Sequence, residues 1–493
     1  MYTMKTRTLS ELLGTLNITT NTIVEHRSVL PGEAAMSNPT SPNILDKVRE
    51  VLDHSNRLCL ASSVDGNPSL YNSEFVSSDS GDELVLYIPI SAESVTGQHL
   101  LYNRKVQVQI QDTSTTVDMA GWVEPVKDHS FLDGRLEDQA NPNLGWYQLH
   151  PTKITVGRLD GGARQSITVD ENKIGFFTEV KKSFQTRSKL WFRATRAPFF
   201  TATLVPVLLG STIAWVDKGL FFWERFLIAL VAGLFIHAGT NLINDFFDQG
   251  GDSYNKNVSP FNAGSQTIQS ELMSSTKVGV SAFLCFGTGT VMVLYLQFLV
   301  GGVVLPILLF FGLFIAVFYT ADPIRLSHHG LGEVANFLGY GPVLTLSCWF
   351  IHVGPNVPLE DFVLPGYWSV IPGLLLAQIL LINEFQDYDA DLLVGKRTLV
   401  VRISKDKAVF LYQLMTLVVY IWVLVGSLLF YKQALLAILA IGILPISLKA
   451  IKHMKANFRE AMELIPANAM TVQVHLFVGL LVTAGVAITN VVM

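Results

Sequence analysis

The chain has 493 residues, of which half are hydrophobic and only 15% are charged, and its formal net charge at pH 7 is −5. A mean hydropathy of +0.39 excludes an ordinary soluble protein as a description of the whole chain. The three cysteines form no CxxC pair, which disfavours a disulfide framework or a zinc site. No basic stretch indicates a nucleic-acid partner.

The first part of the chain has the mixed composition of a soluble domain. Residues 1–42 are rich in Ser, Thr, Asn and Pro, and we interpret them as a flexible arm without a secretory signal. Residues 43–175 are predicted to form a small α+β domain built on a β-barrel. An amphipathic helix in "NILDKVREVLDHS" comes first, and a hairpin turns at "DGNP". The strand "ELVLYIP", the helix "SAESVTGQHLLYN" and the strands "KVQVQIQD", "TVDMAGWVEPV" and "KITVGRL" follow. Residues 176–190 form a basic connector.

Apolar runs of membrane-spanning length recur through residues 191–493. The sequence therefore predicts an all-α polytopic bundle of nine transmembrane helices in a lipid bilayer. The predicted spans are 195–216, 221–244, 276–298, 301–320, 331–352, 366–384, 407–429, 432–450 and 470–491.

Lys and Arg alternate along the connections between these spans. They concentrate before the first span, after the sixth and after the eighth, whereas the other connections hold few. By the positive-inside rule, the N-terminal domain and the even-numbered connections lie in the cytoplasm, and the C-terminus lies outside. We expect a cell (inner) membrane protein with its site on the cytoplasmic side.

The second predicted span ends in the polar stretch "NLINDFFDQGGD". If the helix continues through it, four residues spaced four, three and four apart share one face: Asn241, Asp245, Asp248 and Asp252. Asn244 lies beside that face. Carboxylates stacked in this way are unfavourable unless a cation lies between them, although a solvated helix end is the simpler alternative for one such cluster.

A second cluster, "NEFQDYDAD", ends the sixth span. Asn383, Asp387 and Asp391 are spaced four apart and share a face, whereas Asp389 points away. Two such faces on the same side of the membrane predict an oxygen-rich pocket. Hard oxygen ligands suit Mg²⁺, which commonly bridges to substrate phosphates.

These motifs resemble those of UbiA-type intramembrane prenyltransferases. "NDFFDQGGD" fits the pattern NDxxDxxxD, and "NEFQDYDAD" contains the second motif, DxxxD. The stretches "SPFNAGSQTI", "YTADPIRL", "GLGEVANFLGYGP" and "GKRTLVVRI" resemble the 1,4-dihydroxy-2-naphthoate prenyltransferase branch. The resemblance covers about residues 190–493. It implies Mg²⁺-dependent transfer of a polyprenyl group from a polyprenyl diphosphate to an aromatic acceptor in lipoquinone (menaquinone-like) biosynthesis.

The resemblance also implies roles for individual residues. The implied metal ligands are Asp245, Asp248, Asp252, Asp387 and Asp391. The implied catalytic residues are Asp245, Asp248, Asp387, Asp391, Arg325 and Lys396. Arg325 and Lys396 would meet the diphosphate, although both positions also suit positive-inside anchors. The implied substrate-binding residues are Asn241, Asn244, Tyr319, Asn383 and Arg397.

Tyr319 has an alternative interpretation as an interface residue at the end of a span. The histidines of this region are not expected to act in the chemistry. His237 is interpreted as a hydrogen-bonded residue of the bundle, and no metal site is expected at His328 and His329.

The N-terminal domain, in turn, resembles the pyridoxamine-phosphate-oxidase-like split barrel, which implies a bound FMN. Its loop "SAESVTGQHL" carries Glu93 and no Lys or Arg before Arg104, where a flavin phosphate would need a cation. Two interpretations remain open: a flavin-binding domain, and a barrel that serves only for docking or dimerisation.

Two other functions compete with prenyl transfer to an aromatic ring. A UbiA-like membrane terpene cyclase would use the same metals but quench the carbocation internally. A transporter would place its charged residues near the midplane on broken helices, whereas the carboxylates here cluster at span ends. The sequence leaves open the acceptor, the prenyl length and the oligomeric state.

Overall fold

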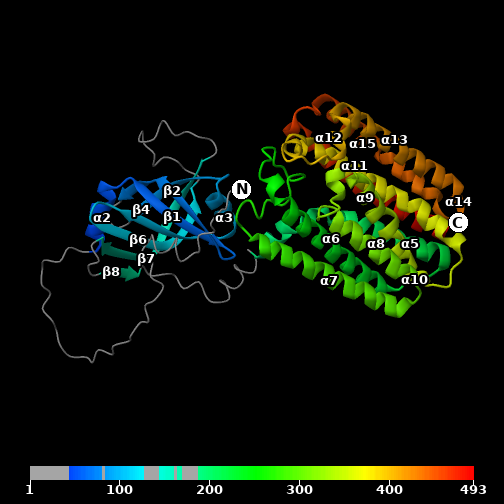
Figure 1. Cartoon of the computed structure of the whole chain (residues 1–493), viewed down its shortest axis with the longest axis horizontal. Coiled ribbons are helices and arrows are strands. Elements are labelled where there is room, and N and C mark those ends of the chain that lie inside the picture. Colours follow the sequence, from blue (N-terminus) through cyan, green and yellow to red (C-terminus); the bar gives the residue numbers. More distant parts are fainter. Residues whose placement is uncertain (1–43, 80–83, 127–143, 160–163, 169–186, 493) are drawn as a thin grey trace.

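The computed structural model describes residues 44–79, 84–126, 144–159, 164–168 and 187–492. The arm predicted over residues 1–42 and most of the connector 176–190 lie outside these ranges. The described chain forms two lobes, an N-terminal β-sheet domain and a helical bundle (Figure 1).

The N-terminal lobe contains eight strands and two helices within the described residues. The elements in chain order are α2 (Ile44–His54), β1 (Arg57–Val64), β2 (Asn67–Glu74), β3 (Val76–Asp79), β4 (Leu84–Ser91), α3 (Val95–Tyr102), β5 (Lys105–Gln111), β6 (Thr115–Pro125), β7 (Leu144–Arg158) and β8 (Gln165–Thr168). Alternate residues of β1 and β5 are buried, as expected for strands with one face toward a core.

The strands form one curled antiparallel sheet in the order β2-β1-β5-β6-β7-β4-β3, and β8 pairs with β7. Asp65 and Gly66 make the β1–β2 turn in the left-handed region, at φ 54° and 86°, as a two-residue hairpin of this kind requires. The predicted helices, hairpin and strands are confirmed. The predictions lacked β3 as a separate strand, β8, and the first half of β7, which begins at Leu144.

The second lobe is an all-helical bundle. Its α-helices are α5 (Thr201–Lys218), α6 (Trp223–Asp252), α7 (Ser275–Val300), α8 (Val304–Phe318), α9 (Gly332–Leu338), α10 (Leu344–Val353), α11 (Val363–Leu393), α12 (Leu399–Ile403), α13 (Lys405–Leu429), α14 (Tyr431–Ala434), α15 (Leu444–Asn457) and α16 (Ile465–Val492). A turn of π-helix, Gly339–Val343, joins α9 to α10.

Among the described residues, eight helical segments are long and apolar enough to cross a membrane. A ninth, α8, has only 15 residues. The nine predicted spans therefore match the positions of the helices. The helix at the fourth predicted span, 301–320, is shorter than that span. The turn at Gly301 and Gly302, both with positive φ, accounts for the difference because it delays the helix start to Val304.

The longest helices, α6 and α11, carry the two acidic clusters. Both continue past their apolar segments, so each acidic stretch is helical, to Asp252 in α6 and to Leu393 in α11. The buried core of the bundle lies mainly around Trp349 and Trp368, both fully inaccessible, at the far end of these helices from the aspartates. The polar ends therefore lie outside this core.

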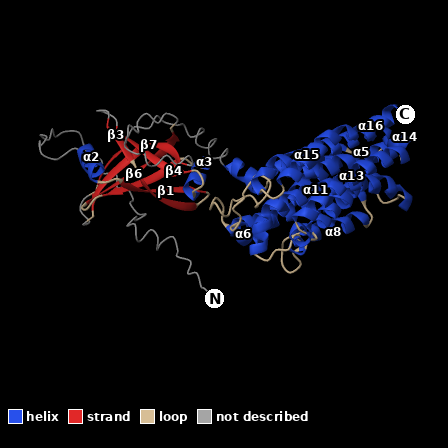
Figure 2. Cartoon of the chain, turned by 90° about the horizontal axis from the view of Figure 1, so that it is seen from above, coloured by secondary structure: helices blue, strands red, loops and turns tan. Residues whose placement is uncertain are grey.

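The connection from α6 to α7, residues 253–274, has no long helix and lies over the polar end of α6; we call it the α6–α7 loop. The N-terminal domain is next to this end of the bundle. Figure 2 shows α3 at the side of the sheet that faces α6. Val64, at the end of β1, belongs to the same buried apolar cluster as Leu272 and Met273 of the loop.

Candidate active site

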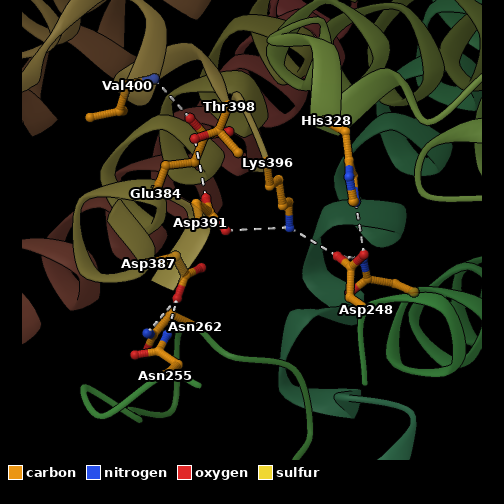
Figure 3. A network of polar contacts seen from close by, with 11 residues as sticks. Asp248, Asn255, Asn262, His328, Glu384, Asp387, Asp391, Lys396, Thr398 and Val400 are labelled. Atoms are coloured by element: carbon orange, nitrogen blue, oxygen red, sulfur yellow. Dashed lines mark hydrogen bonds and ion pairs between the residues drawn. The ribbon is translucent and has the colours of Figure 1, made fainter. Parts of the chain in front are cut away.

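Asp248 lies at the centre of the polar site formed by the ends of α6 and α11. Lys396 Nζ donates to Asp248 Oδ2 at 2.9 Å and lies 3.8 Å from Asp391 Oδ1. His328 Nε2 is 3.1 Å from Asp248 Oδ1, and Asn244 Nδ2 donates to Oδ2 at 3.2 Å. Figure 3 shows Lys396 between the two aspartates, so this single ammonium joins the two acidic faces.

Lys396 lies in the short connection between α11 and α12 and is held as a cation. Burial by itself would lower the pKa of its ammonium, but the carboxylates of Asp248 and Asp391 outweigh that effect and raise the pKa well above its ordinary value. The side chain is 17% exposed and is directed into the site. A permanent positive charge is therefore available to an anionic ligand.

The α11 face differs in its partners. Asp387 Oδ1 accepts hydrogen bonds from Asn255 Nδ2 at 2.6 Å and from Asn262 Nδ2 at 2.7 Å, both in the α6–α7 loop (Figure 3). Asp391 Oδ2 accepts from Thr398 Oγ1 at 3.2 Å. The two amides orient Asp387 without cancelling its charge, whereas Asp391 also lies near the ammonium of Lys396.

The α6–α7 loop also holds Asp245. The hydroxyl of Ser265 donates to Asp245 Oδ2, and the Ser265 N–H is 3.2 Å from Oδ1. Gly264, at φ 65°, lies so close that a Cβ there would be 2.7 Å from both Asp245 Oδ1 and Asp252 Oδ2. Only glycine lets the loop backbone approach the two carboxylates in this way.

These groups surround a cavity of about 170 Å³. Its charged lining consists of five carboxylates and two cations: Asp248, Asp252, Glu384, Asp387, Asp391, Arg196 and Lys396. The neutral lining includes Asn241, Asn244, Asn262, Asn383 and Tyr319. Asp245 contacts the loop rather than the cavity.

The excess of carboxylates over cations fits a divalent metal ion, because hard oxygen donors are the preferred ligands of Mg²⁺. Within the described ranges, however, no three His, Cys, Asp or Glu side chains converge closely enough to bind a metal by themselves. The donor set therefore fits a cation that is bound jointly by the protein and by the oxygens of an anionic ligand.

A second cavity of about 130 Å³ adjoins the first. The two share five lining residues: His237, Thr240, Tyr319, Asn336 and Tyr340. The remaining wall is almost entirely aliphatic and comes from α6, α8 and α10, with Leu305, Leu309 and Leu344 among its residues. A polar chamber thus opens beside an apolar one.

Tyr319 lies at the junction of the two cavities. Its side chain is half-buried and lines both chambers. The alternative interpretation of Tyr319 as a residue at the membrane interface stays a prediction.

The structure brings most of the sequence-predicted residues to the cavity lining, but three do not line it: Asp245, which contacts the loop, Arg325 and Arg397. Arg325 forms an ion pair with Asp322 and is absent from the cavity lining. Arg397 is exposed, and its described hydrogen bonds are made by its backbone: the N–H donates to the His328 carbonyl at 3.1 Å, and the carbonyl accepts from Arg402 Nε at 3.1 Å. His237 is hydrogen-bonded to Thr203, at 2.9 Å, as expected.

Sequence reasoning missed several polar residues of the site. His328 was expected to lack a carboxylate partner, yet folding places it against Asp248 from a distance of 80 residues. Asn255, Asn262, Ser265, Arg196 and Thr398 were also missed as site residues. The stretch "SPFNAGSQTI" was noted for its resemblance, and its Asn262 and Ser265 were the available signal.

Curated relatives match the second part of the chain. A 2-carboxy-1,4-naphthoquinone phytyltransferase of Arabidopsis thaliana is 27% identical over 313 residues, which are 62% of this chain and 78% of the relative. A 1,4-dihydroxy-2-naphthoate octaprenyltransferase of Bacillus subtilis is 25% identical over 309 residues, which are 62% and 94% of the two chains.

Solved structures match each lobe separately. A UbiA homolog of Archaeoglobus fulgidus bound to GPP and Mg²⁺ is similar over 60% of this chain and 99% of its own, with a TM-score of 0.43 and 14% identity. A protein of the pyridoxinephosphate oxidase family from Clostridium acetobutylicum covers 26% of this chain and 94% of its own, with a TM-score of 0.22 and 12% identity.

The family of the membrane lobe is shown by a sequence model. The model of the UbiA prenyltransferase family matches residues 203–465, more than half of the chain, and includes both acidic clusters and Lys396. The protein is therefore an integral membrane prenyltransferase that belongs to the UbiA prenyltransferase family.

Proposed function

We propose that this enzyme transfers a polyprenyl group from a polyprenyl diphosphate to an aromatic acceptor of the naphthoate type, in lipoquinone biosynthesis. The observation that carries the proposal is the cavity between α6 and α11, where five carboxylates meet the half-buried cation Lys396 beside an apolar chamber. The names of two curated relatives, both naphthoate or naphthoquinone prenyltransferases, support this class of acceptor.

In this proposal the polar chamber binds the diphosphate. Mg²⁺, when bound, would neutralise the diphosphate and improve it as a leaving group. Asp248, Asp252, Asp387 and Asp391 would hold the metal together with the diphosphate oxygens, as the solved UbiA homolog with GPP and Mg²⁺ also suggests. Asp245, which contacts Ser265, would orient the loop over the metal site.

Lys396 would turn from Asp248 toward the diphosphate and stabilise the negative charge that develops as the C–O bond breaks. The allylic carbon loses its diphosphate and accepts an electron pair from the aromatic ring, which then releases a proton. The half-buried Tyr319 lies where the two chambers join, so its ring would shield the carbocation from water. The apolar chamber would receive the prenyl tail.

We further propose that the site opens to the cytoplasm, because Lys and Arg concentrate in the connections on that side of the predicted topology. FMN has no part in the proposed reaction. Among the described residues of the N-terminal domain, α3 carries no Lys or Arg, and its polar side chains Gln98 and His99 contact the helical lobe instead.

The test is an assay of the purified protein with Mg²⁺, geranylgeranyl diphosphate and 1,4-dihydroxy-2-naphthoate, with products identified by mass spectrometry. We expect a prenylated naphthalenoid whose formation requires Mg²⁺ and is lost in Asp248→Ala. The exposed Asp389→Ala, on the same helix as the second acidic face, is the matched control and should retain activity.

The other outcomes separate the competing functions. Release of diphosphate with a cyclised hydrocarbon and no aromatic adduct would instead identify a membrane terpene cyclase. If no diphosphate is released from prenyl donors of several lengths, the proposed reaction is wrong.

A further inference from the structure

The N-terminal domain contacts the bundle at the same loop that closes the acidic cavity. His99, on α3, is completely buried, and its Nε2 lies 3.3 Å from the carbonyl oxygen of Glu271 in the α6–α7 loop. Its Nδ1 lies 3.3 Å from Ser62 Oγ on β1. Because a carbonyl only accepts hydrogen bonds, Nε2 carries the proton, and the ring connects the sheet to the loop.

Arg193 provides a second connection and reaches the site more directly. It lies in the helical segment 187–194 that leads into the bundle. Its Nε donates to the Ser265 carbonyl at 2.9 Å, and its Nη1 donates to Gln98 Oε1 at 3.1 Å. Since the Ser265 hydroxyl and N–H both contact Asp245, one guanidinium links α3 to a residue that holds a site carboxylate.

The other end of the loop is also fixed by the N-terminal domain. Asp65, in the β1–β2 turn, forms an ion pair with Lys277 in the first turn of α7. Beside it, Val64 packs against Leu272 and Met273, which are inaccessible or nearly so. Polar and apolar contacts therefore hold the loop from the same side.

The loop requires such support because its backbone is strained. Ala263, Gln266 and Glu271 adopt φ values of 55°, 58° and 53°, in the left-handed region that non-glycine residues rarely occupy. Conformations of this kind persist only where the surrounding structure fixes them. Within the loop, Asn262 and Ser265 each depend on that backbone to reach their aspartates.

We propose that the N-terminal domain is a positioning element of the prenyltransferase site: it clamps the α6–α7 loop through α3 and Arg193. The clamp keeps Asn262 on Asp387 and Ser265 on Asp245, in the orientation that receives the metal and the diphosphate. The inference rests on the proposed function of that site. It assigns the domain a role in substrate affinity that requires no cofactor of its own.

The first arm of the test changes Arg193 in the full-length protein. In Arg193→Met we expect amide hydrogen exchange in residues 253–274 to increase, and the KM for the prenyl diphosphate to rise about tenfold, as for other outer-shell contacts. The kcat should change less, because Arg193 does not touch the reacting atoms. Arg187→Met, an exposed position on the same helix, is the matched control and should behave as wild type.

The second arm reverses an ion pair remote from the cavity. Asp65→Lys and Lys277→Asp should each raise the KM by about threefold to fivefold, which is the scale of a single exposed ion pair. The double variant should restore both the KM and the exchange pattern. Aspartate is tolerated in the first turn of α7, so Lys277→Asp should fold.

Several outcomes would overturn the inference. These are wild-type exchange in Arg193→Met, increased exchange with an unchanged KM, an equal loss in Arg187→Met, and a double variant that stays impaired. The exchange measurement needs no turnover. A wild-type protein that releases no diphosphate would therefore disprove the proposed function, while exchange alone would still decide whether the domain clamps the loop.

Discussion

The two acidic faces of the site have similar sequences but different surroundings. On α6, Asp248 is bound by a cation, Lys396, and by His328. On α11, Asp387 is bound by two amides, those of Asn255 and Asn262, and by no cation among the described residues. The same spacing of asparagine and aspartate is therefore used in two ways.

The difference indicates which carboxylate is oriented to bind a metal ion and which one is held by a cation of the protein. Amides orient Asp387 and leave its negative charge for a metal ion. Asp248 shares its charge with Lys396, which must move when a more highly charged ligand arrives. Asp387 on α11 therefore has the character of a prepared metal ligand, whereas Asp248 on α6 is joined to a cation that can be transferred to the diphosphate.

The largest effect should come from removing either face. We expect Asp387→Ala and Asp248→Ala each to lower kcat/KM by more than about 100-fold, since outer-shell partners of a metal alone contribute about 10- to 100-fold. Steady-state assays with varied Mg²⁺ provide the measurement. Near-normal activity in Asp387→Ala would contradict the distinction between the two faces, because the aspartates of α6 would then be sufficient for metal binding.

Lys396→Met should have the next largest effect, a loss of about 100-fold in kcat, because a cation that stabilises developing charge in the cavity is removed. In the absence of diphosphate, the same variant should bind Mg²⁺ more tightly than wild type, since no ammonium competes for Asp248. Calorimetric titration with Mg²⁺ measures this directly. Arg397→Met, at the exposed neighbouring position, should differ from wild type by less than about threefold; an equal loss there would contradict the specific role of Lys396.

Asn262→Ala should have an intermediate effect and act mainly on Mg²⁺. We expect the Mg²⁺ concentration required for half-maximal rate to rise about tenfold, because Asp387 loses one of its two orienting donors. His328→Gln should change this concentration less, since Asp248 keeps Lys396. The reverse order would show that the α6 face, not the α11 face, is the prepared metal site.

The smallest effect lies outside both faces, at His99. Burial lowers the pKa of its imidazole below the ordinary value of 6.5. An unfolded or undocked domain therefore binds a proton more readily than the folded one, so stability is lost as the pH falls below about 6.5. The melting temperature of the full chain should drop by a few degrees between pH 7.5 and 5.5, and His99→Gln should flatten this dependence. An equal drop in both proteins would assign the effect to other groups.

The sequence predicted the two lobes, the helices and the pairing of the acidic clusters because these features are local and periodic. Asp245 and Asp248 share a face through helical geometry alone. His328 and Arg193 could not be assigned in this way, because their partners are 80 and 72 residues away along the chain. Arg325 was assigned to the site from the family resemblance and from its position after the fourth span, yet it pairs with Asp322, three residues away.

By itself, the sequence determined that this is a membrane protein with two oxygen-rich helix ends, because hydropathy and helical spacing are properties of contiguous residues. That it is an enzyme was implied by the resemblance of its motifs to a known family. Only the tertiary structure decided that Lys396 lies between those ends, that loop amides bind Asp387, and that α3 contacts the loop. These contacts depend on how elements that are distant in the chain pack together. Packing depends on how the faces of distant helices and strands fit together when they are buried, and a local sequence pattern does not contain that information.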